Sequence, residues 1–327
     1  MEKQCSVLIH SKDPPGVVAD IRDALEKGKM PDKIAAMKKT IMLMMSGEIL
    51  DGFLMVIIRF VLPQEDHQLK KLSLIYLEIV DKTDAAGKLL PEFILVCNQV
   101  LNDLNHPNEY IRGCTLRFVT KMKEQELLEP WVAAIKNNLE HRHSFVRRNA
   151  VLTLYSIHAH NEDLIPDAPD IVEEFLRSEQ DLGPKRNAFL MLYHCAQDRA
   201  VAYLDDVIHE VSDFGESMQL LVLELIKKVC RTSPADKAKY IRIIFNFIES
   251  PAAAVRYDAA CTLVSLSKST TALRAATGAF CKLLATQSDN NIKLIVLDRL
   301  IEIKKSNKEA LHDTLMDIMK VLSSPNL

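Results

Sequence analysis

Several histidines fall in short clusters that could bind a metal ion. His141 and His143 flank a single arginine, and His158 and His160 form a second pair, with His106 further upstream. Zinc sites place their ligands at characteristic spacings, such as HExxH or paired Cys and His, and neither pattern occurs here. These histidines fall at predicted turns between helices, where an imidazole can cap a helix or face solvent. We therefore expect them to be structural and expect no metal site.

Basic side chains recur at regular intervals and form the second candidate site. The favoured interpretation is a ladder of exposed or ion-paired residues along one edge of the fold, because the near-neutral net charge of −3 provides no long-range steering field. The alternative is a basic strip that faces an acidic partner or anionic lipid. The candidate protein-interaction edge comprises Lys70, Lys71, Asn108, Arg112, His141, His143, Arg147, Arg148, Lys185 and Arg186.

No arrangement of residues predicts catalysis. The sequence contains no GxSxG nucleophile elbow, no GxxxxGK[ST] phosphate loop and no GxGxxG dinucleotide motif. We expect no enzymatic activity, no cofactor and no small-molecule substrate. A methionine cluster at Met42, Met44, Met45 and Met55 lies in apolar helical runs. Core packing is the favoured role for these side chains, with an adaptable binding surface as the alternative.

The elements that would position these residues are indicated by a repeated pattern. In Val146, Arg147, Ala150 and Leu154 it reads apolar, basic, two variable residues, small, three variable residues, apolar. Copies 34 to 42 residues apart predict one helix–turn–helix unit per repeat, near the period of HEAT and armadillo proteins. The copies begin at residues 69, 111, 146, 184, 218, 255 and 292, and a fainter one precedes them near Lys33.

Helix geometry gives each copy a place within its repeat. The first, fifth and ninth residues are successively about 40° further round an α-helix and form one stripe about 80° wide. Each copy is therefore predicted to be the second helix of a pair, and its small residue lets a neighbouring helix come close. Predicted N-caps stand three residues before four of the starts, at Asp66, Asn108, Asp181 and Asp289, whereas Gly215 and Ala252 make poor caps.

Length and composition support a repeat architecture. The chain has 327 residues, 48% of them apolar, and only 9 glycines. A single compact core stops growing beyond about 250–300 residues. We predict an all-α, right-handed α-solenoid of about seven to eight HEAT/armadillo-like helix pairs spanning residues 21–327, after a poorly ordered segment at residues 1–20. Since Lys308–Leu322 reads as a first helix, the sequence is expected to end in mid-repeat, as part of a longer protein.

The charge balance and the cysteines narrow the class of protein. An isoelectric point of about 6.4 argues against nucleic-acid binding. The seven cysteines are widely separated and form no CxxC pair, which favours a reducing, cytosolic compartment. No signal peptide and no apolar run of transmembrane length are present in the sequence.

Several longer stretches carry a more specific resemblance. In the order in which they occur, they resemble the N-terminal trunk of coatomer beta subunits, a family of vesicle-coat proteins, and the resemblance runs from about residue 24 to residue 327. The stretches are residues 57–67, 104–118, 140–150, 165–169, 185–189 and 288–300.

The resemblance implies a non-enzymatic cytoplasmic coat protein, peripheral on Golgi and coated-vesicle membranes. The implied partners are other coatomer subunits, delta in particular, and an Arf-type small GTPase in its GTP state, expected to contact helices between about residues 40 and 150. Three alternatives stay open at this point: a clathrin-adaptor large chain, a generic HEAT/armadillo transport receptor and a HEAT-like DNA-repair enzyme. The last would need a basic concave face.

Overall fold

The fold is built from helix pairs, as the repeat predicts. The computed structural model describes residues 17–48, 50, 52–84, 87–233, 237–307 and 315–322. Contacts divide the chain into two compact units, Met1–Met191 and Leu192–Leu327. Within the described residues all regular elements are helical, and the one β-contact is an isolated bridge between Thr83 and Leu89. The all-α class is thereby confirmed.

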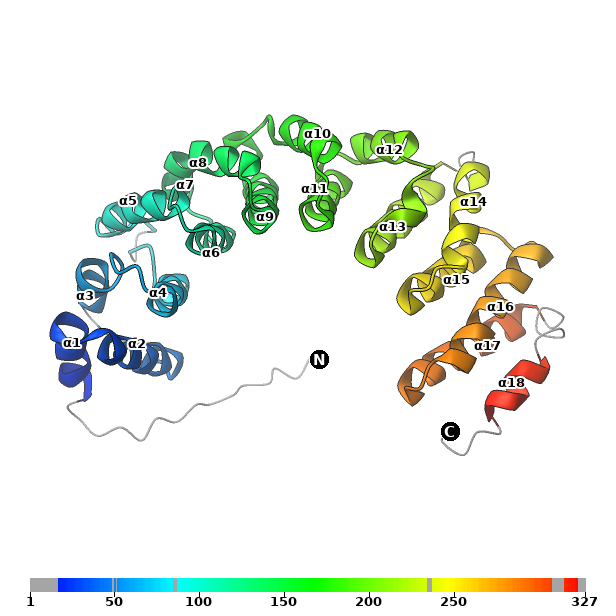
Figure 1. Ribbon diagram of the computed structural model, residues 1–327, viewed down its shortest axis with the longest axis horizontal. Coiled ribbons are helices and arrows are strands. Elements are labelled where there is room, and N and C mark those ends of the chain that lie inside the picture. The colour runs from blue at the N-terminus through cyan, green and yellow to red at the C-terminus, as the bar shows by residue number, and fades with distance from the viewer. Residues whose placement is uncertain are drawn as a thin grey trace. The chain divides into compact units, whose positions relative to one another are not determined.

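The first unit has two layers of helices (Figure 1). One layer holds the first helix of each pair and the other holds the second. The first helices are α1 (Val17–Lys27), α3 (Phe53–Phe60), α5 (Phe93–Leu104), the broken segment α7 (Gln125–Leu128), η1 (Glu129–Trp131), α8 (Val132–Asn137) and η2 (Asn138–Glu140), and α10 (Ala168–Ser178). The second helices are α2 (Met30–Met45), α4 (His67–Ile79), α6 (Glu109–Val119) and α9 (Ser144–His160), and α11 (Leu182–Cys195) spans the boundary between the units.

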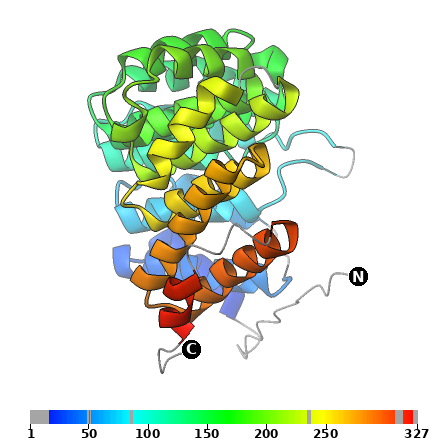
Figure 2. The same ribbon diagram turned by 90° about the vertical axis from the view of Figure 1, so that its right-hand side faces the viewer.

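The second unit follows the same plan, and Figure 2 turns it toward the viewer in yellow to red. Its first helices are α12 (Gln197–Asp206), α14 (Lys237–Ile248), α16 (Thr270–Thr286) and α18 (Leu315–Leu322), and its second helices are α13 (Glu216–Thr232), α15 (Ala253–Leu266) and α17 (Asn290–Ser306). Short 3-10 turns η3 (Glu162–Leu164) and η4 (Val211–Asp213) occupy two of the connections in the chain.

The repeat pattern locates the second helices closely. The seven second helices from α4 to α17 each begin two residues before the start of the matching copy of the repeat. The faint copy at Lys33 lies within α2. The predicted stripe is buried in α9, where Val146, Ala150 and Leu154 are all 0% exposed. The pattern is therefore an inter-helix packing stripe, because burial of these apolar groups stabilises the stack.

The predicted helix caps are confirmed in three of four cases. The side chains of Asp66, Asn108 and Asp289 each accept a hydrogen bond from a backbone N–H of the helix that follows. The side chain of Asp181 accepts a hydrogen bond from Arg147, and its role as a cap stays a prediction. Ala252 and Gly215 stand at N-cap positions and provide no side-chain cap.

Three expectations concern the ends and the division of the chain. Most of the expected N-terminal segment, residues 1–16, lies outside the described residues, and residues 17–20 form the first turn of α1. The predicted final first helix, Lys308–Leu322, is described only from Leu315 onward, as α18. A single solenoid over residues 21–327 stays a prediction, since the contacts define two units.

The expected core role of the methionine cluster was wrong. Met42 and Met45 are 49% and 59% exposed, and Met44 and Met55 are half-buried. In α2 the buried side is supplied by other residues, Met37, Ile41 and Leu43 among them. Periodicity cannot identify which apolar residues of a nearly all-apolar run face the core.

Candidate protein-interaction surface

The basic residue of the repeat closes the turn that precedes its helix. In three repeats its guanidinium donates a hydrogen bond to the carbonyl oxygen six residues earlier, inside the turn between the two helices. A buried carbonyl that lacks a partner is costly, so this contact stabilises the turn. The pairs are Arg112 with His106 at 2.9 Å, Arg147 with His141 at 2.9 Å and Arg256 with Ser250 at 2.8 Å.

In the first unit the same residue also reaches the next repeat. Its acceptor lies at or just after the C-terminal end of the following first helix, so one side chain joins two successive pairs. The contacts are Lys70 Nζ to Asp103 at 2.7 Å, Arg112 to Asn138 Oδ1 at 3.1 Å, and Arg147 to the two carboxylate oxygens of Glu179 at 2.6 and 2.9 Å.

The pair formed by Lys70 and Asp103 is the most deeply buried of these contacts. The two residues are 5% and 2% exposed. Lys70 also donates to the Leu62 carbonyl at 2.8 Å, and Asp103 accepts a further hydrogen bond from Gln99 at 3.1 Å. Buried charges are tolerated where they are paired and hydrogen-bonded in this way. Lys70 is therefore a structural residue and is not available to a partner.

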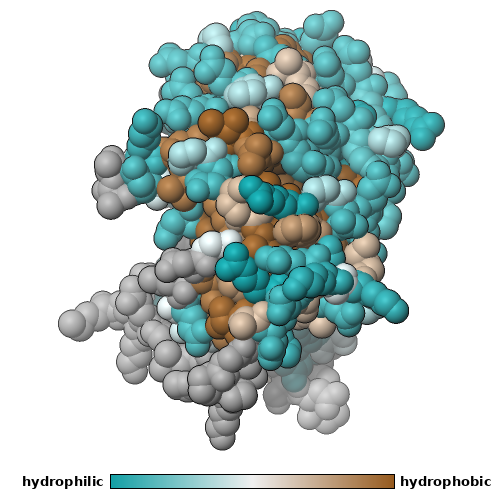
Figure 3. Space-filling model, turned by 90° about the vertical axis from the view of Figure 1, so that its left-hand side faces the viewer, coloured by the Kyte–Doolittle hydropathy of each residue, from teal (hydrophilic) through white to brown (hydrophobic). Residues whose placement is uncertain are grey.

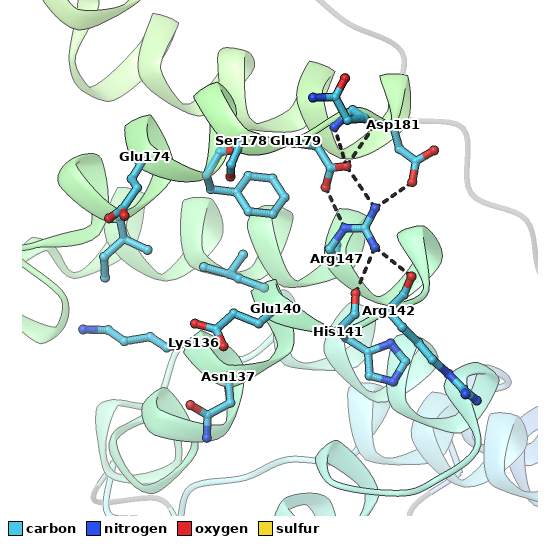
Figure 4. Close-up of a pocket in the computed structure, with 14 residues that line it drawn as sticks. Lys136, Asn137, Glu140, His141, Arg142, Arg147, Glu174, Ser178, Glu179 and Asp181 are labelled. Carbon is cyan, nitrogen blue, oxygen red and sulfur yellow. Dashed lines mark hydrogen bonds and ion pairs between the residues drawn. The ribbon is translucent and has the colours of Figure 1, made fainter.

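Arg147 is the centre of a larger cluster, shown in Figure 4. Its guanidinium binds Glu179 on one side, Asp181 at 2.6 Å, and the carbonyl oxygens of His141 and Arg142. The hydrogen bonds to Glu179 and Asp181 and the charges of these two carboxylates raise the pKa of Arg147 above its ordinary value, against the effect of burial. Burial alone would raise the pKa of Glu179, but the hydrogen bond from Arg147, the backbone N–H groups of Asp181 and Gln180 and the arginine charge together lower it. Arg147 and Glu179 are therefore both charged and are paired with each other.

A groove of about 700 Å³ opens beside this cluster, between η2 and α10 (Figure 4). Half-buried Ile171 and Phe175 contribute apolar surface to it. Acidic Glu140 and Glu174 and basic Lys136 line it as well, so the groove carries charges of both signs. Mixed charge of this kind gives no preference for a strongly charged ligand.

Three of the histidines cap turns, as the sequence indicates, whereas His158 and His160 lie in the last turn of α9. His106 Nδ1 accepts from the Asn108 N–H at 3.0 Å, His141 Nδ1 from the His143 N–H at 3.1 Å, and His143 Nδ1 from the Phe145 N–H at 3.3 Å. Burial, followed by the nearby charges of Arg112 and Arg142, lowers the pKa of His141. In the part of the chain that the structure describes, His, Cys, Asp and Glu side chains form no group of three or more suited to a metal ion.

The ten residues of the candidate edge divide by exposure. Lys70 is buried; Lys71, His143 and Arg148 are exposed; and Asn108, Arg112, His141, Arg147, Lys185 and Arg186 are half-buried. The Arg148 guanidinium lies over the Phe145 ring, 5.5 Å from its centroid. A ligand would therefore meet chiefly the three exposed side chains, and binding at this edge stays a prediction.

The acceptors of the ladder were not found from the sequence. Asp103, Asn138 and Glu179 lie 33, 26 and 32 residues after their basic partners. A search for acidic or amide residues about one repeat period after each basic position would have found two of them. The search would miss Asn138, because it lies only 26 residues after Arg112, which is less than one repeat period.

Comparison with known proteins identifies the family. A model described as "Adaptin N terminal region" matches residues 15–327. The chain belongs to this family. The match over nearly the whole chain agrees with the stacked helix pairs of the fold.

Members with close sequence similarity are coatomer beta subunits. "Coatomer subunit beta-2" of Arabidopsis thaliana is 51% identical over 330 residues, which is all of this chain and 35% of that protein. "Coatomer subunit beta" of Dictyostelium discoideum is 50% identical over 328 residues, and that of Rattus norvegicus is 51% identical over 331 residues. The resemblance derived from the sequence is confirmed, and the chain spans about a third of the length of these relatives.

A structural comparison supports the fold. A chain in "Homology model of the full-length AP-3 complex in an intermediate open conformation" matches with a TM-score of 0.73, covering 90% of this chain and 52% of that chain. At 16% sequence identity this likeness concerns the fold alone. The two chains therefore share an architecture without sharing a detailed sequence. In the described segments, no helix is both long and apolar enough to cross a membrane.

Proposed function

We propose that this chain is a non-enzymatic scaffold of a coatomer-type vesicle coat. The observation that carries the proposal is the identity of about half of all positions, over the whole chain, with coatomer beta subunits from plants, a slime mould and mammals. Stacked helix pairs suit this role, because they create extended surfaces on which other proteins bind.

The finer proposal concerns the partners. As a coat trunk, the chain holds a partner coat subunit, delta in particular, and binds an Arf-type GTPase in its GTP state. It acts in Golgi–ER retrograde and intra-Golgi transport, and associates peripherally with Golgi and coated-vesicle membranes. The GTPase is proposed to contact helices between about residues 40 and 150, a span that includes the exposed Lys71, His143 and Arg148.

A pull-down tests the nucleotide dependence of this binding. The chain is immobilised with the delta subunit present, and an Arf-type GTPase is added with either a GTP analogue or GDP. We expect retention of the GTP-analogue form alone. No retention of either form by a chain shown to be folded would overturn the coat proposal.

Charge-reversal variants test the proposed edge. Lys71→Glu and Arg148→Glu change exposed side chains of the candidate edge, and Lys268→Glu is a matched control at an exposed lysine outside the proposed span. We expect each edge variant to weaken GTPase retention and the control to leave it unchanged. Equal retention by all three would move the interaction away from this edge.

A further inference from the structure

An apolar groove lies near the N-terminal end of the described fold and takes no part in the ladder. It has a volume of about 450 Å³ and is formed by the end of α2, the start of α3, the end of α4 and the turn before α5. The apolar residues that line it include Met44, Leu54, Met55, Ile79 and Leu90. On the side of the first unit that Figure 3 faces, apolar side chains gather in the middle of the surface with hydrophilic ones around them.

The apolar surface around this groove is unusually exposed for large side chains. Ile79 in its lining is 41% exposed, and Met44, Leu54, Met55 and Leu90 are half-buried. Ile94 and Leu95, in the first turn of α5 shortly after Glu92 of the lining, are 63% and 47% exposed. Exposed apolar surface of this kind marks interaction sites in soluble proteins.

The methionines indicate what kind of surface this is. Methionine is unbranched and polarisable, so a surface rich in it can adapt to apolar side chains of different shape. Such surfaces characteristically receive the apolar face of an amphipathic helix. Met44 and Met55, both half-buried, line the groove where a partner helix could contact them.

The charges that line the groove are all negative. Glu48, Asp81 and Glu92 line it, and the described lining contains no lysine or arginine. Lys82, next to Asp81, donates to the carbonyl oxygens of Glu78 and Val80. The Oε2 atom of Glu92 is buried and has no hydrogen-bond partner. A buried carboxylate oxygen without a donor is costly, so a donor from a bound partner would stabilise it.

We propose that this groove binds an amphipathic helix of a partner protein, whose apolar stripe contacts the methionine-rich lining and whose lysine or arginine pairs with the acidic side chains. The charged side chains of the described lining are all acidic. Charge complementarity therefore favours a basic helix over an acidic or neutral one. The inference is independent of the coat proposal, because it rests only on the lining of the groove.

The test uses a synthetic peptide as the probe and the full 327-residue chain. A fluorescently labelled amphipathic peptide carries leucines at helical spacing with flanking lysines, and binding is measured by fluorescence polarisation. One control peptide has glutamates in place of the lysines, and a second has the same composition in scrambled order. We expect saturable binding of the first peptide only, weakening as salt is added.

Two variants with matched controls locate the site. Ile79→Lys places a positive charge in the lining, and its control is Met316→Lys at a 70% exposed position in α18. Glu92→Gln removes the unpartnered carboxylate, and its control is Glu162→Gln at an exposed position in η3. We expect Ile79→Lys and Glu92→Gln each to weaken binding about tenfold, and both controls to change it less than about twofold.

Three results would overturn the proposal. The first is equal binding of the lysine peptide and its controls. The second is equal affinity in Ile79→Lys and Met316→Lys chains whose circular dichroism matches the unmodified protein. The third is concentration-dependent dimerisation that Ile79→Lys abolishes, since a second copy of the chain would then occupy the groove.

Discussion

The ammonium group of Lys70, at the start of α4, lies 2.7 Å from the carboxylate of Asp103, near the end of α5. The two residues are 33 positions apart, close to one repeat period, and both are buried. Lys70 occupies the basic position of the repeat, which could have bound a ligand. Its side chain instead joins one helix pair to the next.

Removing one member of the Lys70–Asp103 pair should lower the free energy of unfolding. Asp103→Leu leaves the Lys70 ammonium buried without its counter-charge, and we expect a loss of about 3–5 kcal/mol in the free energy of unfolding. The double variant Lys70→Met with Asp103→Leu should recover most of this loss, because it leaves no unpaired charge. Urea unfolding measures both. Lys136→Met is the control, because its partner Asp167 is 53% exposed and the expected cost is only about 0–1 kcal/mol. If Asp103→Leu and Lys136→Met lowered the free energy of unfolding equally, burial would not explain the cost of breaking the Lys70–Asp103 pair.

The Arg147–Glu179 contact should give the protein an acid-sensitive component of stability. The pKa of Glu179 is lowered in the fold from its ordinary value of 4.5. A lowered carboxyl pKa contributes stability that is present above the ordinary value and is lost as pH falls through the lower folded value. At pH 7 the Glu179→Gln variant should therefore have a lower melting temperature than the unmodified protein. The difference between the two melting temperatures should become smaller below about pH 4.5. Thermal melts across this range test the expectation, and parallel curves would contradict it.

Gly113 of α6 lies against the ring of Phe145 in α9. A Cβ atom at this position would lie 2.2 Å from the Cε1 atom of Phe145. Gly113→Ala should therefore lower the free energy of unfolding, because overpacking costs about 1–3 kcal/mol and exceeds the roughly 1 kcal/mol gained in helix propensity. A second substitution, Phe145→Leu, should restore part of the loss.

Gly278, in α16, is the matched control for this steric argument. A Cβ atom there meets nothing within 4 Å. Gly278→Ala should stabilise the protein by about 0.5–1 kcal/mol. If both alanine variants shift the chemical-denaturation midpoint in the same direction, the contact with Phe145 is not what requires glycine at position 113.

Exposed apolar residues on α17 should promote self-association of this chain. Leu294, Ile295 and Ile301 are 54%, 51% and 50% exposed. We expect sedimentation velocity to show association that grows with concentration and that the double variant Leu294→Glu with Ile301→Glu reduces. Lys304→Glu, at an exposed position on the same helix, is the control for added charge. A chain that stays monomeric at high concentration would contradict the prediction.

Much of the architecture was predictable from sequence because its signals are local. The apolar stripe of each second helix follows from the 3.6-residue period, and it located the start of seven helices to within two residues. N-caps such as Asp66 and Asn108 act within three residues of their own position, so their types are informative without any neighbour. Membership of the coat family was likewise visible in ordered stretches of sequence.

Only the tertiary structure decided what the basic and methionine residues do. Lys70 and Lys71 are adjacent lysines, yet one is buried against Asp103 and the other is exposed, because only one of them faces the neighbouring helix pair. The methionines of α2 and α3 read as core from an apolar run, but no helix in the described fold covers Met42 and Met45. Burial and pairing depend on groups about one repeat away, and the local pattern holds no information on the turns that bring those groups together.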